Sequence, residues 1–92
     1  MKYFTHLQSS NMPKNRLQKE MLAFLKDQSN RLIEDLEDFK TYLKNETEKI
    51  VRRNRRCRPL SVSFYKTVGE NWGLSLSGTD WSVSFYIYKV KE

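Results

Sequence analysis

The strongest constraint on the fold is a run of three alternating segments near the C-terminus. Apolar and polar residues alternate over residues 60–68, 72–77 and 81–88, and short turns containing Gly69 and Gly78 separate these segments. Alternation with a period of two is typical of strands that bury one face, and short glycine turns between such strands indicate antiparallel hairpins. We therefore expect a three-stranded antiparallel β-meander with one apolar face that another element must cover.

The first half of the chain has the pattern of a long helix that covers this face. Residues 14–56 contain no Gly or Pro, and their apolar residues recur at spacings of three, four and seven, as on one face of a helix. We expect a helical segment over residues 13–57, continuous or kinked near Ser29 and Asn30, where the pattern is weakest and Asn30 is able to cap a second helix. Pro59 ends the segment because the residue before a proline avoids helical geometry.

These segments predict an α+β fold in a single domain, residues 1–92, with one long N-terminal helix packed on the three-stranded sheet of residues 60–90. The N-terminal segment, residues 1–12, is able to add a short extra strand. A helix of about forty residues spans roughly 60 Å, whereas strands of this length reach about 25 Å, so the helix overhangs the sheet. The overhang predicts a homodimer through the helix, around residues 17–25. The residues expected in the core are Leu36, Phe39, Leu43, Phe64, Leu74, Leu76, Val83 and Phe85.

The positive charge of the chain is concentrated in one short stretch. The net charge is +6, from 17 Lys and Arg against 11 Asp and Glu, and residues 49–58 hold six basic residues and no acidic one. The rest of the chain is therefore neutral overall. Cations favour a helix C-terminus, but five arginines in seven positions exceed that role. We therefore favour a surface that contacts phosphate or an acidic protein groove over a merely solvated helix end.

Local acids neutralise only part of this charge. Two pairs have the spacing of intrahelical ion pairs, Glu46–Lys49 and Glu48–Arg52. The other four arginines of the stretch have no acidic residue at this spacing, so we expect them to be unpaired.

A second candidate surface lies on the polar side of the predicted meander, where tyrosines alternate with serines. Aromatic side chains on a sheet stack the bases of single-stranded nucleic acid, and arginine makes bidentate contacts with phosphate. The bland alternative is that tyrosine and serine are ordinary residues of exposed strands. The candidate binding residues are Lys49, Arg52, Arg53, Arg55, Arg56, Arg58, Tyr65, Tyr86 and Tyr88.

Motifs for catalysis and metal binding are absent from the sequence. It contains no glycine-rich nucleotide loop, no G-x-S-x-G and no H-E-x-x-H. A single cysteine, Cys57, excludes an intrachain disulfide and a cysteine-built zinc site, and the single histidine is His6. The acidic residues between 34 and 38 are expected on a solvated helix face. We therefore expect no enzymatic activity, no metal or cofactor, no membrane span and a cytoplasmic location.

The favoured function is that of a small, basic, non-enzymatic protein that contacts RNA, another single strand or a nucleoprotein through its arginine-rich helix end. One alternative is a protein-directed inhibitor, such as a phage-type viral inhibitor of a host defence nuclease, which would use the same Arg and Tyr side chains as interface hot spots. The layout of strand, helix and meander also resembles that of small RelE-like ribonuclease toxins, in topology alone and without a matching motif. This resemblance implies a ribonuclease toxin as a second alternative.

Overall fold

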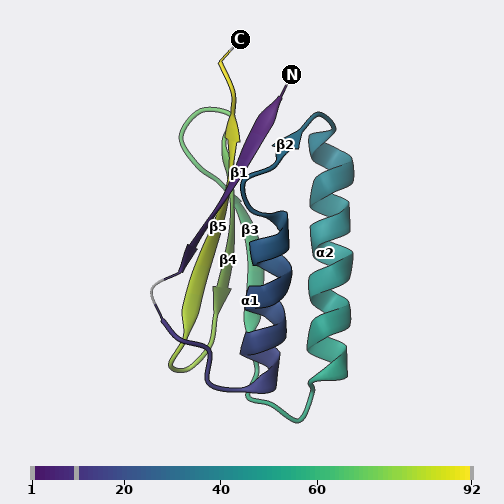
Figure 1. Cartoon of the computed structure of the whole chain (residues 1–92), viewed down its shortest axis with the longest axis vertical. Helices are drawn as coiled ribbons and strands as arrows, with labels where there is room; N and C mark the ends of the chain where they lie inside the picture. Colours follow the sequence, from purple (N-terminus) through teal and green to yellow (C-terminus); the bar gives the residue numbers. More distant parts are fainter. Residues whose placement is uncertain (1, 10, 92) are drawn as a thin grey trace.

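The computed structural model describes residues 2–9 and 11–91 and has two layers, a five-stranded antiparallel sheet and two helices on one of its faces (Figure 1). The α+β class agrees with the sequence-based prediction, but the predicted arrangement of one long helix on a three-stranded meander is wrong. The strands lie in the order β2-β1-β5-β4-β3. The elements are β1 (Tyr3–Ser9), α1 (Arg16–Gln28), β2 (Leu32–Ile33), α2 (Leu36–Arg53), β3 (Ser61–Lys66), β4 (Trp72–Ser77) and β5 (Ser82–Lys89).

The predicted long helix is broken at Ser29, and α2 runs back alongside α1 (Figure 1). Asn30 has a φ of 61°, a left-handed conformation that Asn tolerates better than most residues. The cause of the break lies in β1, where the buried Thr5 hydroxyl donates to the Gln28 carbonyl at 2.6 Å and accepts from the Arg31 N–H at 2.9 Å. The Asn30 N–H donates to the Thr5 carbonyl at 2.8 Å. These bonds replace those that a continuing helix would make.

Both helices begin at side-chain caps that satisfy their first free N–H groups. Asn15 Oδ1 accepts from the Gln18 N–H at 2.8 Å, and Asp35 Oδ1 accepts from the Asp38 N–H at 3.0 Å. The acidic residues at the start of α2 and the arginines in its last turn both complement the helix dipole. Across the described ranges, neither helix has the length and apolar character that a membrane crossing needs.

The predicted meander is present, but it is part of a larger sheet. β3, β4 and β5 are antiparallel neighbours close to the predicted ranges. The N-terminal segment, which was expected to add a short strand at most, forms the seven-residue β1, which pairs with β5 along its whole length. β1 also pairs with the two-residue β2 in the connection between the helices. The sheet is therefore wide enough to be covered by two helices side by side.

The core lies between the sheet and both helices. Of the predicted core residues, Leu36 and Phe64 are partly buried and the others are buried. The segment around residues 17–25, which was expected to overhang the sheet, belongs to this core. The structure therefore removes the reason for predicting a homodimer through the helix. The buried apolar residues of α1 are Leu17, Met21, Leu22 and Leu25.

Candidate functional site

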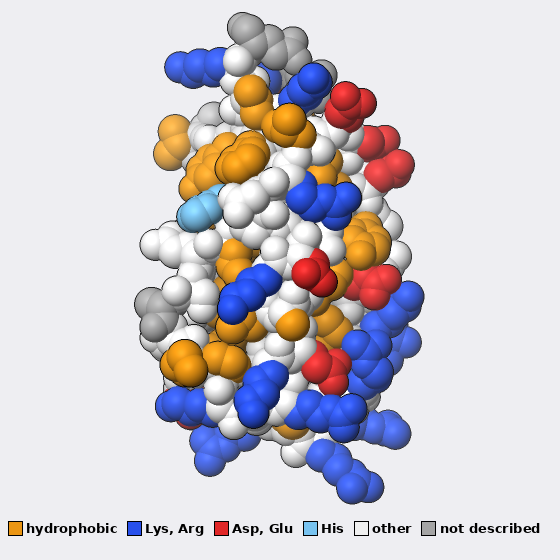
Figure 2. Space-filling view, viewed as in Figure 1, with side chains coloured by type: hydrophobic (Ala, Val, Ile, Leu, Met, Phe, Trp, Pro, Cys, Tyr) orange, Lys and Arg blue, Asp and Glu red, His pale blue; other side chains and the backbone are white. Residues whose placement is uncertain are grey.

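The arginine-rich end, which comprises Lys49, Arg52, Arg53, Arg55, Arg56 and Arg58, lies at the end of the molecule where α2 stops and the chain turns toward β3. Figure 2 shows Lys and Arg side chains crowded at this end. The local structure depends on Asn54, a buried residue that caps α2. The Asn54 side-chain N–H donates to the Ile50 carbonyl at 2.9 Å, and the Asn54 backbone carbonyl accepts from the Cys57 N–H at 3.0 Å. The chain thus leaves the helix in a compact turn that exposes Arg55 and Arg56.

The two ion pairs predicted from spacing are present. Lys49 Nζ lies 3.5 Å from Glu46 Oε1, and Arg52 Nη2 lies 3.9 Å from Glu48 Oε2. Both pairs are accessible to solvent, and exposed pairs contribute about 0–1 kcal/mol to stability. Lys49 and Arg52 therefore keep most of their capacity to contact a partner.

Arg53 was expected to be unpaired, and that expectation is wrong. Glu20 of α1 accepts hydrogen bonds from Arg53 Nη2 and from Arg16 Nε, each at 3.1 Å. The Arg53 hydrogen bond is the main reason that the pKa of Glu20 lies below its usual range, against partial desolvation, which raises the pKa. Arg53 thus links the two helices. No local pattern reveals this contact, because its partners are 33 residues apart.

Arg55, Arg56 and Arg58 carry the charge that remains uncompensated. All three are exposed, and within residues 2–9 and 11–91 no acidic side chain lies within ion-pair distance of them. Asp80, in the turn before β5, pairs with Lys14 at 3.3 Å. The Lys14 hydrogen bond lowers the pKa of Asp80, and the charge of Arg58 adds a smaller effect in the same direction. These three arginines are therefore available to an external anion.

The tyrosine face is the face of the sheet that the helices leave uncovered, and the register joins its aromatic residues in one row. His6 of β1 lies opposite Tyr86 of β5, Tyr86 lies opposite Gly73 of β4, and Gly73 lies opposite Tyr65 of β3. Tyr88 is next but one to Tyr86 on the same strand and on the same face. Strand pairing thus assembles side chains that are far apart in the sequence.

The three tyrosines form one packed cluster. The rings of Tyr86 and Tyr88 stack with centroids 5.7 Å apart and an interplanar angle of 22°. The Tyr65 ring lies so close over Gly73 that a Cβ there would overlap it. Desolvation, followed by the hydrogen bond and charge of Tyr86, raises the pKa of Tyr65. Gly73 is therefore part of this surface, a role that the alternation pattern alone does not reveal.

The tyrosine face carries no negative charge. β1, β3, β4 and β5 contain no Asp or Glu, so these strands place no carboxylate on this face. Six serines form a serine strip between the tyrosines and the arginine-rich end. Four residues of strand separate Tyr86 from the far row of this strip, which is about 13 Å. The serine strip comprises Ser61, Ser63, Ser75, Ser77, Ser82 and Ser84.

Neither a metal cluster nor a similar protein helps to interpret this surface. Within the part of the chain that the structure describes, no three metal-ligating side chains lie together. Comparison of the chain with known protein families, curated proteins and solved structures finds no match.

Proposed function

We propose that this protein binds single-stranded nucleic acid, with RNA as the first ligand to test, and that it does so without catalysis. The observation that carries the proposal is the set of three exposed arginines, Arg55, Arg56 and Arg58, that have no acidic partner among the described residues. Arginine contacts phosphate through bidentate hydrogen bonds. Such a cluster at the end of a folded scaffold is suited to a sugar–phosphate backbone.

The tyrosine face extends this basic surface with a place for bases. Tyr65 and Tyr88 are 38% and 40% exposed, so their rings are packed at one side and accessible at the other. Stacking on such rings tolerates any base, but it requires bases that are not already stacked in a duplex. The serine strip between the two regions offers hydroxyl groups and no charge that repels phosphate. These features together favour a single strand that runs from the arginine-rich end to the tyrosines.

The phosphate contacts are tested by the salt dependence of binding. Fluorescence anisotropy of a labelled oligouridine of about 12 nucleotides is measured between about 50 and 200 mM salt. Replacing Arg55, Arg56 and Arg58 with Gln removes three contacts while sparing Arg53, which links the helices. For single strands each contact contributes about 0.7 to the log–log slope, so the slope falls by about 2 and binding weakens about 100-fold near 0.1 M salt.

A matched variant separates this site from a general effect of charge. Lys26 of α1, Lys44 of α2 and Lys91 after β5 are exposed and lie outside both the arginine-rich end and the tyrosine face, and replacing them with Gln removes the same net charge. This control is expected to keep most of the wild-type slope. Equal losses in both triple variants, or unchanged binding in the arginine variant, would contradict the proposed phosphate site.

The stacking contribution is tested at Tyr88, the most exposed member of the tyrosine cluster. Tyr88→Ala is expected to weaken binding of the single strand by about 1–3 kcal/mol, and Tyr88→Phe, which keeps the ring, by much less. An RNA duplex of the same length is expected to show no difference between the two variants. Equal effects of Ala and Phe would contradict stacking at this face.

The same samples discriminate the alternatives. A denaturing gel after incubation is expected to show intact RNA, and specific cleavage would favour the ribonuclease alternative instead. An absence of RNA binding with capture of a protein partner that salt barely affects would favour the protein-directed inhibitor.

A further inference from the structure

One edge of the sheet is open to another strand. The sheet ends on one side in the short β2 and on the other in the six-residue β3. The Thr67 N–H donates to the Asn71 carbonyl at 2.9 Å, and because bonded and non-bonded pairs alternate in antiparallel strands, this bond sets the phase of the β3–β4 ladder. The backbone groups of Val62, Phe64 and Lys66 therefore point away from β4, and nothing in the described ranges pairs with them.

The sequence of β3 does not protect this edge. Natural edge strands are commonly blunted by charges, proline or bulges. In β3 the only charged residue is Lys66 at its end, residues 61–65 contain neither a charged residue nor a proline, and β3 pairs with β4 in unbroken register. The valine and aromatic residues of this segment also favour extended structure. The outward N–H and C=O groups of β3 are therefore able to pair with a further strand.

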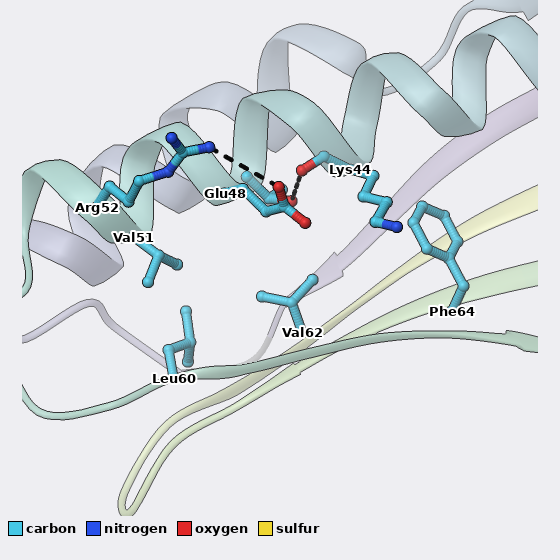
Figure 3. A pocket seen from close by; sticks show the side chains of 8 residues that line it. Lys44, Glu48, Val51, Arg52, Leu60, Val62 and Phe64 are labelled. Carbon is cyan, nitrogen blue, oxygen red and sulfur yellow. Dashed lines mark hydrogen bonds and ion pairs between the residues drawn. The ribbon is translucent and has the colours of Figure 1, made fainter.

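The open edge borders an apolar groove between α2 and β3 (Figure 3). The groove has a volume of about 700 Å³. Val51 points from α2 toward Leu60, while Val62 rises from β3 toward the helix and Phe64 lies further along the strand. Val62 and Phe64 are only half-buried. A strand added to the edge would thus place every second side chain in this groove.

The groove exists because α2 packs over the neighbouring strands and not over β3. The ring centroids of Phe39 and Phe85 lie 6.5 Å apart, which anchors α2 on β5. The Lys40 ammonium lies 3.5 Å from the centroid of the Trp72 ring, which anchors α2 on β4. The apolar side of β3 therefore lacks the cover that the rest of the sheet receives.

The charges along the groove indicate which segment fits it. Lys44 and Arg52 stand near its two ends on the α2 wall, and Glu48 between them pairs with Arg52 at 3.9 Å (Figure 3). Lys44 has no ion pair among the described residues. Arg52 itself belongs to the arginine-rich end, so the groove shares this one residue with that surface. The α2 wall is thus positive at both ends and net positive, because the one carboxylate between them, Glu48, is paired with Arg52.

We propose that the β3 edge binds an extended acidic segment of a partner protein, which adds a sixth strand to the sheet. The segment hydrogen-bonds to Val62, Phe64 and Lys66, places an apolar side chain in the groove, and directs flanking carboxylates to Lys44 and Arg52. Main-chain bonds supply affinity in this mode of recognition, and alternate side chains supply specificity. A second copy of this chain suits the site poorly, since it carries the same basic residues and would meet like charge. The site is separate from the tyrosine face and does not depend on the proposed binding of nucleic acid.

The test is an NMR titration of the full chain with the blocked peptide Thr-Glu-Thr-Val-Thr-Glu-Thr. The amide signals of Val62, Phe64 and Lys66 are expected to shift and to exchange more slowly with solvent. Val62→Pro removes one outward N–H at an edge position that tolerates proline and is expected to weaken binding about tenfold, as for the loss of one hydrogen bond. Val62→Thr keeps the N–H and the branched shape and is expected to bind within about threefold of wild type.

The charge preference supplies a second variant, which remains informative if Val62→Pro fails to fold. A second peptide carries Lys at both Glu positions, and the wild type is expected to prefer the Glu peptide. Lys44→Glu is expected to reverse this preference in favour of the Lys peptide. Lys19→Glu, the same change on the exposed side of α1, is expected to keep the wild-type preference. Equal binding of both peptides to the wild type overturns the acidic partner. Unshifted β3 amides at saturating peptide overturn the site. A dimer in light scattering, with β3 amides protected before peptide is added, shows that a second copy occupies the edge and also overturns the proposal.

Discussion

The Thr5 hydroxyl is the group on which the two-helix arrangement most directly depends. Its side chain is fully buried, donates to the Gln28 carbonyl at 2.6 Å and accepts from the Arg31 N–H at 2.9 Å. Thr5→Val keeps the shape of the side chain and leaves both backbone groups without this partner. A buried polar group left unpaired costs about 1–3 kcal/mol. Because Arg31 is exposed and retains access to water, we expect a total loss of about 2–3 kcal/mol.

The measurement is urea unfolding followed by tryptophan fluorescence, together with thermal unfolding. For a domain of this size a loss of 2–3 kcal/mol lowers Tm by about 8–24 °C. Thr47→Val is the matched control, because Thr47 is also a buried threonine but donates to the carbonyls of Leu43 and Lys44 within its own helix. Those carbonyls keep their helical partners, so we expect this control to lose less than about 1 kcal/mol. Losses within about 0.5 kcal/mol of each other in the two variants would refute the role assigned to Thr5.

Three further outcomes are expected. Phe85→Ala removes a fully buried ring and should destabilise the chain by about 3–5 kcal/mol; an unchanged urea midpoint would contradict the core described above. Gly73→Ala should displace the Tyr65 ring, which lies where the new Cβ would be, so its destabilisation should be much smaller in a Tyr65→Ala background; equal losses in both backgrounds would exclude this contact. The Arg53 hydrogen bond lowers the pKa of Glu20 in the folded state, so its stabilisation is present above the unfolded pKa and is lost as pH falls through the folded pKa. The Tm difference between wild type and Glu20→Gln should therefore shrink on going from pH 6 to pH 3, approximate limits that bracket the usual carboxyl range; a constant difference would show that the ion pair does not couple to folding.

The candidate binding surface could be predicted in part. The concentration of arginines and the tyrosines of the polar strand face are visible in the sequence, as are the pairs at spacings of three and four residues. The Arg53 ion pair could not be predicted from residue spacing, because its partner Glu20 lies on the other helix. Gly73 shows the same limit, since its role appears only when β3 and β4 are in register and the Tyr65 ring lies above it.

The C-terminal meander was determined by the sequence itself, because alternation and glycine turns act between residues that are close along the chain. The break between the helices was decided by tertiary structure. Residues 14–56 contain neither Gly nor Pro, and their apolar spacing suits one helix as well as two. The N-terminal strand settles the choice, since Thr5 hydrogen-bonds to a segment more than twenty residues away. A buried strand must satisfy its polar groups where the fold places them, and no local pattern records where that is.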